Sequence, residues 1–305
     1  MYDIIIVGAG PAGLCAALYA RRAEKTVLLI EKSTFGGQIT HSPRVENYPG
    51  FIEMSGNEFA DKLMDQVMSL GGEIELDEVK GVEKIDTGYM VTTENNTFMA
   101  KSVIIATGSR HRPLGIEREE EFVGEGISYC AVCDGAFYKD KTVAIIGGGN
   151  TALQEAVLLS EGCKKVYVVQ NLDFLTAEGS LVSAIEKRDN VEVILSSVAT
   201  ELVGEGEIKG LRLMNLSTAE ERTLDLDGIF VAIGQIPENE QFSNVVALDE
   251  RGYVKAGEDC LPENAGEGIF VAGDCRTKAI RQITTATADG AVAALAACRY
   301  VDSLK

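Results

Sequence analysis

The chain contains one glycine-rich unit twice, and this repeat limits the folds that it can adopt. In the first copy an apolar segment, residues 2–7, leads into the G-x-G-x-x-G pattern of residues 8–13. Gly8 permits a tight turn, Gly10 lets a pyrophosphate approach the backbone, and Gly13 lets a helix pack closely on the strand. A second apolar segment ends at Glu31, which can accept a hydrogen bond from a ribose hydroxyl. We therefore predict a dinucleotide-binding βαβ unit, with contacts from Gly8, Gly10, Pro11, Ala12, Gly13 and Glu31.

The second copy begins with the apolar residues 142–146 and continues with the G-x-G-x-x-A pattern of residues 147–152. In the first copy, Glu31 follows Gly8 by 23 residues. In the second copy, the residue 23 positions after Gly147 is Gln170, which is not an acid. For 305 residues, a size of about 150 residues per domain also suggests two domains. The sequence thus predicts an α/β protein with two Rossmann-like three-layer domains, the second of them degenerate.

The charge and composition exclude several classes of protein. The formal net charge is −19, so binding to nucleic acid or to an anionic membrane surface is not expected. No apolar run reaches the roughly 18 residues of a membrane span, and the N-terminus lacks the basic start of a signal peptide. Seven cysteines are too few for a disulfide scaffold. We expect a cytoplasmic protein in a reducing compartment.

A single C-x-x-C motif, Cys130-Ala131-Val132-Cys133, precedes the second copy. Its spacing suits a reversible disulfide, whereas a zinc site would need a second such pair, so no metal site is predicted. Asp134 follows directly and could shuttle a proton or cap the local turn. A dinucleotide and a dithiol on one chain imply two-electron transfer between them. A flavin can mediate that transfer, since the cofactor supplies the chemistry and the protein supplies its placement.

These motifs, taken in order along the chain, resemble the low-molecular-weight thioredoxin reductases. The resemblance also rests on Gly36-Gly37-Gln38, Asn47-Tyr48-Pro49-Gly50, Ala106-Thr107-Gly108, residues 128–135, Gly273-Asp274 and Arg281-Gln282. It implies an FAD-binding domain in two segments, 1–115 and 245–305. It also implies an inserted NAD(P)H-like domain, 116–244, that carries the redox dithiol, and a homodimer.

The resemblance assigns roles by position. The first glycine turn and Glu31 would hold the adenosine side of FAD, and Asp274 would meet the ribitol chain. Cys133 would face the flavin, Cys130 would attack the disulfide of a thioredoxin-like protein, and Asp134 would donate a proton. A domain rotation is expected at the crossings near Glu117 and Gln241. The remaining implied FAD contacts are Gly37, Gln38, Asn47, Ala106, Thr107, Gly108, Gly273, Arg281 and Gln282.

The sequence departs from the family in the second copy. Members that use NADPH carry H-R-R-x-x-x-R after the strand, and their arginines grip the 2′-phosphate. Here residues 170–176 place Asn171, Leu172 and Thr176 at the three arginine positions. Asp173 comes three residues too late for the ribose and is expected to be a loop or cap residue.

Three interpretations of the electron source follow. In the favoured interpretation, the chain belongs to the subset of thioredoxin reductases that does not use pyridine nucleotides and takes electrons from reduced ferredoxin. The second is weak use of NADH or NADPH, and the third is a flavin redox sensor without turnover. Because ferredoxins are acidic and this chain carries −19, a local basic patch is required. The expected patch is Arg276, Lys278 and Arg281, with Arg110 and Arg112 as second candidates.

Overall fold

The computed structural model describes residues 1–42 and 44–304. The chain divides into a first unit, residues 1–110 with 236–305, and an inserted unit, residues 111–235. The expected boundaries were 115 and 244. At the crossings, β7 (Ser109–His111) and β16 (Gln235–Pro237) pair as a two-stranded sheet, so the chain crosses as strands and not at the acidic run around Glu117.

The first unit is built on a seven-stranded sheet in the order β3-β2-β1-β6-β5-β4, with β17 also paired to β6. Strand β1 runs parallel to both β2 and β6, and β17 is parallel to β6. The strands are β1 (Tyr2–Val7), β2 (Val27–Glu31), β3 (Glu73–Leu76), β4 (Val79–Ile85), β5 (Gly88–Thr93), β6 (Thr97–Ile105) and β17 (Ile269–Val271).

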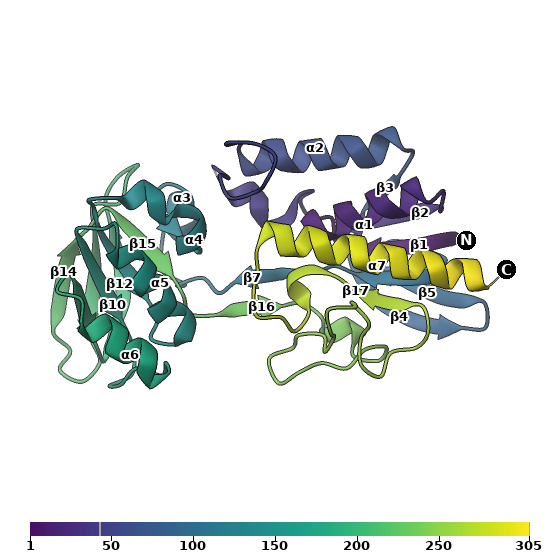
Figure 1. Ribbon diagram of the computed structural model, residues 1–305. Helices are drawn as coiled ribbons and strands as arrows, with labels where there is room; N and C mark the ends of the chain where they lie inside the picture. Colours follow the sequence, from purple (N-terminus) through teal and green to yellow (C-terminus); the bar gives the residue numbers. More distant parts are fainter. Residues whose placement is uncertain (43, 305) are drawn as a thin grey trace. The chain divides into compact units, whose positions relative to one another are not determined.

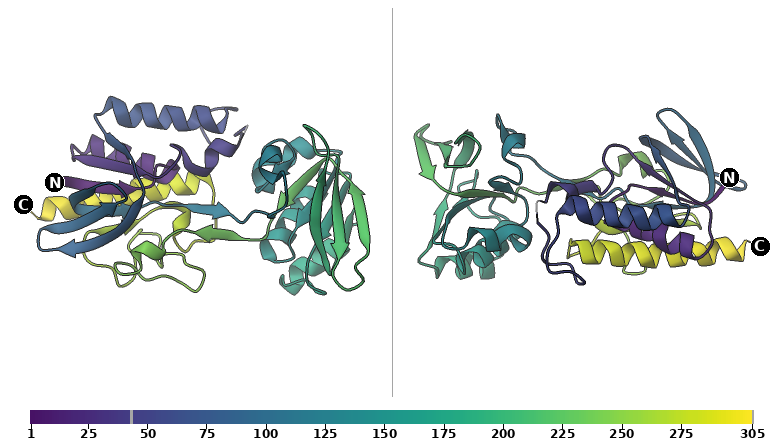
Figure 2. Two further views of the ribbon diagram at one scale, coloured as in Figure 1. Left: turned by 180° about the vertical axis from the view of Figure 1, so that it is seen from behind. Right: turned by 90° about the horizontal axis from the view of Figure 1, so that it is seen from above.

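Helices α1 (Pro11–Arg22) and α7 (Ile283–Ser303) lie together against this sheet, as Figures 1 and 2 show. Both are rich in alanine, and their buried alanines form one apolar core with Ile4, Ile6 and Leu29 of the sheet. Small side chains let the two helices approach closely and bury apolar area. The other helical segments are α2 (Gly56–Ser69), η1 (Gly37–His41), η3 (Glu240–Phe242) and η4 (Gly273–Cys275).

The inserted unit repeats the parallel arrangement with five strands in the order β11-β10-β9-β15-β8. One face packs against helices α5 (Asn150–Ser160) and α6 (Gly179–Glu186), and the other against an antiparallel sheet of β12, β13 and β14 (Figures 1 and 2). The remaining elements are α3 (Glu119–Phe122), β8 (Ile127–Ser128), α4 (Ala131–Asp134), η2 (Gly135–Tyr138), β9 (Thr142–Ile146), β10 (Lys165–Val169), β11 (Val191–Ile194), β12 (Ser197–Val203), β13 (Gly210–Asn215), β14 (Glu221–Asp225) and β15 (Gly228–Val231).

The prediction of an α/β protein with two Rossmann-type units is confirmed by these sheets. Each glycine-rich turn lies between the first strand and the first helix of its unit, β1 and α1 or β9 and α5. Each turn therefore lies at the carboxyl end of a parallel sheet, where α/β folds bind ligands. None of the helices in the described ranges is long and apolar enough to cross a membrane.

Candidate functional site

The first glycine turn is shaped by close backbone contacts. Gly8 has φ +104°, and a Cβ there would lie 2.3 Å from the carbonyl oxygen of Ala106. A Cβ at Gly13 would lie 1.8 Å from the carbonyl oxygen of Gly8. No side chain fits at either position, so both glycines are required for the tight turn and for the packing of α1 on β1. Gly10 is the N-cap residue of α1, and Pro11 lies in the first turn of the helix. Because glycine has no side chain, the first N–H groups of α1 receive no side-chain cap.

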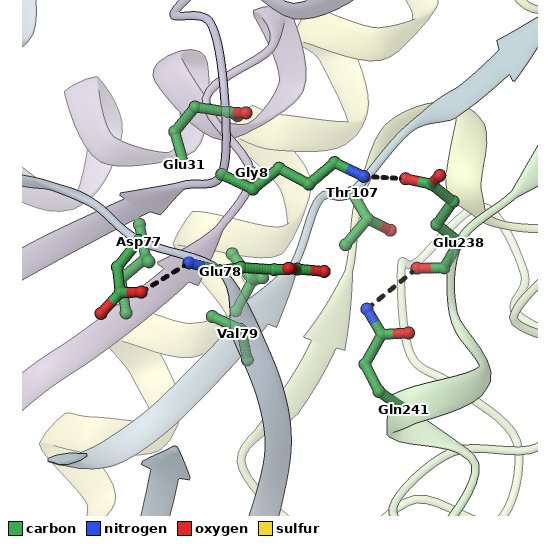
Figure 3. A pocket seen from close by; sticks show the side chains of 11 residues that line it. Gly8, Glu31, Asp77, Glu78, Val79, Thr107, Glu238 and Gln241 are labelled. Atoms are coloured by element: carbon green, nitrogen blue, oxygen red, sulfur yellow. Dashed lines mark hydrogen bonds and ion pairs between the residues drawn. The ribbon is translucent and has the colours of Figure 1, made fainter. Parts of the chain in front are cut away.

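Glu31 closes the turn from the end of β2. Its carboxylate accepts hydrogen bonds from the backbone N–H groups of Ala9 at 2.8 Å and Ser33 at 3.0 Å. A pocket opens beside it, lined also by Gly8 and Thr107, and Figure 3 shows these side chains around one space. The carboxylate thus lies at a concave site next to the glycine turn, where it could accept a hydrogen bond from a ribose hydroxyl.

Eight of the residues that line this pocket were not predicted as site residues from the sequence. Lys32 forms an ion pair with Glu238. Gln241 donates a hydrogen bond to the Glu238 carbonyl, as Figure 3 shows. A usable signal was the place of Lys32, Asp77 and Glu238 directly after strands β2, β3 and β16, since strand ends line the sites of such sheets. The eight are Val7, Ile30, Lys32, Asp77, Glu78, Val79, Glu238 and Gln241.

The first unit brings several of the predicted residues together. The amide of Asn47 donates to the side-chain oxygen of Gln282 at 3.2 Å, although 235 positions separate them. A Cβ at Gly37 would lie 3.2 Å from the Cα of Gly10, and one at Gly273 would lie 2.8 Å from the Cβ of Ala12. Segments far apart in the sequence therefore meet at the first glycine turn.

The other predicted residues of this unit lie on the same sheet edge or the loops around it. Thr107 donates to the side chain of Asn239 at 2.8 Å, and the Ala106 N–H donates to Val7. Gly108 has φ +69°. The guanidinium of Arg281 lies over the ring of Tyr253 at 4.3 Å. Gln38 is exposed on η1.

A buried carboxyl in this unit tests the fit of a flavin dinucleotide. Oδ1 of Asp274 is buried and has no hydrogen-bond partner among the described residues, although the Lys278 ammonium lies 3.9 Å away. Burial raises the pKa of Asp274 to about 6, an effect that the nearby Lys278 and Arg281 oppose. A buried oxygen without a partner is destabilising unless a ligand hydroxyl satisfies it. This carboxyl, with the open glycine turn and Glu31, fits the polyhydroxylated chain and ribose of FAD.

The basic patch expected at Arg276 and Lys278 is wrong. Their side chains are only 1% and 4% exposed. Arg276 donates two hydrogen bonds to the Asp289 carboxylate, at 2.9 and 3.0 Å, and Lys278 donates a third at 2.9 Å. Asp289, on α7, also accepts the Gly273 N–H at 3.0 Å. These cations therefore neutralise a buried carboxylate next to Gly273 and present no surface to an acidic protein.

The dithiol lies in the inserted unit, at the start of the short helix α4. Cys130 and Cys133 form a disulfide, and Cys130 is the N-cap, whose Sγ accepts the Cys133 N–H at 3.2 Å. Both cysteines are partly exposed, and Val132 between them is 58% exposed. The five remaining cysteines are buried and free. The C-x-x-C pair is thus the accessible disulfide in the described residues.

Asp134 follows Cys133 in the sequence and is the last residue of α4. Its Oδ2 accepts the Ser128 hydroxyl at 2.6 Å, while its Oδ1 is buried without a partner in the described part of the chain. Burial raises the pKa of Asp134, and the hydrogen bond from Ser128 opposes the increase. Its side chain makes no capping hydrogen bond to η2, although it holds the N-cap position there. Burial therefore favours the protonated form of this carboxyl more than in an exposed aspartate.

The second glycine turn has side chains packed onto it. A Cβ at Gly148 would lie 2.6 Å from the Gln170 side chain, which is buried. Thr176 donates to the Gly148 carbonyl from its backbone N–H at 2.9 Å and from its hydroxyl at 3.3 Å. Asn150, the first residue of α5, exchanges two hydrogen bonds with Glu178. The loop after β10 thus covers this turn with uncharged groups and a carboxylate.

Comparisons with known proteins agree with this arrangement. The pyridine nucleotide-disulphide oxidoreductase family matches residues 2–290. The thioredoxin reductase of Listeria monocytogenes is 40% identical over 309 residues, covering 100% of this chain and 95% of that protein. A Clostridium pasteurianum protein described as a 34.2 kDa protein in the rubredoxin operon is 40% identical, covering 98% and 97%.

A solved structure extends the likeness to three dimensions. The crystal structure of thioredoxin reductase from Streptococcus pyogenes matches with a TM-score of 0.94 at 37% identity, and the match covers 99% of both chains. The enzymes of this family use FAD, for which the first unit has a fitting site. The chain therefore belongs to the low-molecular-weight thioredoxin reductases of the pyridine nucleotide-disulphide oxidoreductase family.

Proposed function

We propose that this protein reduces the disulfide of a thioredoxin-like protein through Cys130 and Cys133, and that its electrons come from reduced ferredoxin. The observation that carries the choice of donor is the second glycine turn. Gln170 and Thr176 pack onto it, and Asn171, Leu172 and Thr176 stand where a 2′-phosphate would need arginines. Each charged phosphate contact contributes about 1.5–3 kcal/mol, so their loss weakens NADPH binding by several powers of ten.

The first unit would hold FAD along the sheet edge described above. Gly8, Gly10, Gly13 and Glu31 would contact its adenosine side, and Asp274 its ribitol chain. Asn47, Arg281 and Gln282 would lie at the flavin ring. When bound, FAD accepts electrons from the donor and passes two of them to the disulfide.

The chain's own residues then exchange disulfides. Reduction breaks the Cys130–Cys133 bond. Cys130, as thiolate, attacks the thioredoxin disulfide and forms a mixed disulfide, and Cys133 attacks Cys130 and releases reduced thioredoxin. Asp134 supplies or accepts a proton beside them. The dithiol must meet FAD and thioredoxin in turn, so the proposal includes a rotation at the crossings β7 and β16, which are short segments of the hinge kind.

Two further observations bear on the donor. The Clostridium relative described by its place in a rubredoxin operon supports a one-electron carrier as the donor. Because Arg276 and Lys278 are buried, steering toward an acidic donor falls to the exposed Arg112 and to Arg110, which is also exposed but forms an ion pair with Glu238 at 3.0 Å. The family resemblance also implies a homodimer, which we include in the proposal. Light scattering on the purified protein would measure its oligomeric state.

A second candidate function is thioredoxin reduction with NADH or NADPH. It is favoured by the family match, whose members are described by their pyridine nucleotides. In the sequence, Asp173 is the first acid after strand β10, four residues beyond its end.

The decisive experiment is anaerobic stopped-flow absorbance at the flavin band. The FAD-loaded protein is mixed separately with reduced ferredoxin, NADH and NADPH, and thioredoxin reduction is followed in parallel. Rapid bleaching and turnover with ferredoxin alone are expected. Rapid bleaching by NADH or NADPH would establish the second candidate instead. As a check on the dithiol, Cys133→Ser should abolish thioredoxin reduction and retain bound FAD.

A further inference from the structure

A cluster of three buried charged side chains lies next to the Gly273–Asp274 turn and has no role in the proposed mechanism. The side chains of Arg276, Lys278 and Asp289 are 1%, 4% and 8% exposed. Within the cluster two cations face one carboxylate, and the Glu258 carboxylate that lies 3.6 Å from Arg276 is 94% exposed. Desolvation largely offsets the attraction between buried charges, so such a cluster contributes little to stability. The geometry that it fixes is its more informative feature.

Asp289 holds the cluster together from helix α7. Its Oδ2 accepts hydrogen bonds from the Gly273 backbone N–H at 3.0 Å, from Arg276 Nε at 2.9 Å and from Lys278 Nζ at 2.9 Å. Its Oδ1 accepts a second hydrogen bond from Arg276 at 3.0 Å. All of these donors belong to the segment 273–278. The carboxylate therefore fastens this segment, which contains Asp274, to the helix.

The same helix and the same segment meet the first glycine turn. A Cβ at Gly290, the residue after Asp289, would lie 2.2 Å from the Ala12 carbonyl oxygen. A Cβ at Gly273 would lie 2.8 Å from the Cβ of Ala12, which belongs to the G-x-G-x-x-G pattern. Neither position has room for a side chain. Asp289 thus joins the segment to the helix at the place where both pack against the turn that would hold the dinucleotide.

Lys278 is held near Asp274 without a hydrogen bond to it. Its Nζ lies 3.9 Å from Asp274 Oδ1, which is too far for a hydrogen bond, while it donates to Asp289 at 2.9 Å. At that distance the attraction still favours a charged carboxylate in a buried place. Asp274 Oδ1 finds no hydrogen-bond partner in the part of the chain that the structure describes. Asp289 thus keeps the ammonium from occupying an oxygen that a ligand hydroxyl can use.

We propose that Asp289 is a positioning residue for FAD: it fixes the segment 273–278 so that the Asp274 carboxylate accepts a hydroxyl of the ribitol chain. The inference rests on the proposed contact between Asp274 and that chain. Because Asp289 acts through Asp274, its loss weakens ligands that reach Asp274 and spares those that do not. ADP is a ligand of the second kind, since it carries the adenosine and pyrophosphate of FAD but no ribitol chain.

The test compares FAD with ADP on the full chain freed of flavin. Calorimetric titration gives both dissociation constants, and circular dichroism shows that each variant is folded. Asp289→Asn should raise the dissociation constant of FAD about 100-fold, the effect of losing a hydrogen bond to a charged group. The dissociation constant of ADP should stay within about twofold. An equal loss for both ligands would indicate a general distortion of the site and would overturn the proposal, as would an unchanged affinity for FAD.

Two methionine variants form a matched pair. Lys278→Met removes the ammonium near Asp274, keeps the apolar stem, and should raise the dissociation constant of FAD about tenfold. Lys25 is also buried and donates to Asp302 of the same helix at 2.6 Å. Asp302 follows Asp289 by 13 residues, about 20 Å along α7, so Lys25→Met should leave FAD binding within about twofold. Equal FAD affinities in the two variants would contradict the role of the cluster. This pair keeps the test valid if Asp289→Asn fails to fold.

Asp274→Asn separates this inference from the proposed function. It should weaken FAD by itself, and adding Asp289→Asn should then weaken FAD by no more than about threefold further, because two residues that act on one contact are not additive. Losses that multiply in the double variant would overturn the positioning role. An unchanged FAD affinity in Asp274→Asn alone would refute the ribitol contact, and the positioning role with it. Thioredoxin reduction is tested by turnover, which none of these titrations uses.

Discussion

The two glycine turns of this protein share one backbone design. Gly10 and Gly149, which cap α1 and α5, have nearly the same extended conformation, with φ and ψ of −74° and −178° in the first turn and −90° and −178° in the second. In each turn a later loop donates a backbone hydrogen bond to the middle residue. Gly36 donates to Ala9 at 2.8 Å, and Thr176 donates to Gly148 at 2.9 Å.

The side chains around the turns differ. The loop over the first turn is Gly36-Gly37, without side chains, and the strand before it ends in the carboxylate of Glu31. Over the second turn lie Thr176 and the buried amide of Gln170. The glycine pattern therefore serves the packing of a strand against a helix in both units. Whether a dinucleotide has room to bind depends on the loop that follows the second strand of each unit. That loop lies outside the glycine pattern.

The largest effect is expected from a matched pair of substitutions at the helix caps. Both Gly10 and Gly149 have extended backbones, so alanine causes no conformational strain at either. Gly10→Ala should raise the dissociation constant of FAD about 100-fold, because its Cβ occupies the approach of the pyrophosphate and overpacking costs about 1–3 kcal/mol. FAD titration of the apoprotein measures this.

Gly149→Ala is the control for that experiment. A Cβ there meets only the Thr176 hydroxyl, at an ordinary contact distance of 3.6 Å. FAD content and ferredoxin-driven turnover should stay within about twofold of the wild type, since strain-free surface changes have small effects. A large loss of turnover in Gly149→Ala would mean that the second turn holds a ligand after all, and would end the contrast between the two turns.

A smaller effect should follow when the second turn is given cationic side chains. The triple variant Asn171→Arg, Leu172→Arg and Thr176→Arg supplies donors for a 2′-phosphate and removes the Thr176 hydroxyl from Gly148. We expect NADPH-driven reduction at the flavin band to rise about tenfold, with NADH less affected because it lacks the phosphate. Equal gains for both nucleotides would show that only the opening of the turn mattered.

The parts of the fold and site that follow local rules could be predicted from the sequence. The glycine spacings identified both βαβ units, and the C-x-x-C motif indicated the disulfide pair. Each of these depends on residues within about thirty positions of one another, where backbone geometry and side-chain spacing act together.

Contacts between side chains that are far apart in the sequence could not be predicted from such patterns. Arg276 and Lys278 looked like surface cations because the sequence does not show that Asp289 returns to them on α7. Likewise, nothing local links Lys32 to Glu238, or Asn47 to Gln282. Charged residues are rarely buried unless paired, so their burial depends on a partner that only the folded chain supplies.

The smallest expected effect compares equivalent positions of the two helices. Glu155 follows Gly149 by six residues, and Ala16 follows Gly10 by the same number; Ala16 is fully buried. Burial raises the pKa of Glu155 from 4.5 to about 7, so the folded state binds the proton more tightly than the unfolded state. The free energy of unfolding should therefore fall as the pH rises from about 4.5 to about 7, and the loss should be complete above that range.

Glu155→Gln should remove this part of the pH dependence. Between pH 5 and pH 6 the wild type should lose about 1 kcal/mol more stability than the variant, as urea unfolding at each pH measures. Ala16→Ser, a small change at the matching place in α1, introduces no titratable group and should shift stability equally at both pH values. Parallel pH profiles for the wild type and Glu155→Gln would show that Glu155 is already ionised in the folded protein. The two helices would then differ at this position only in packing, and not in protonation.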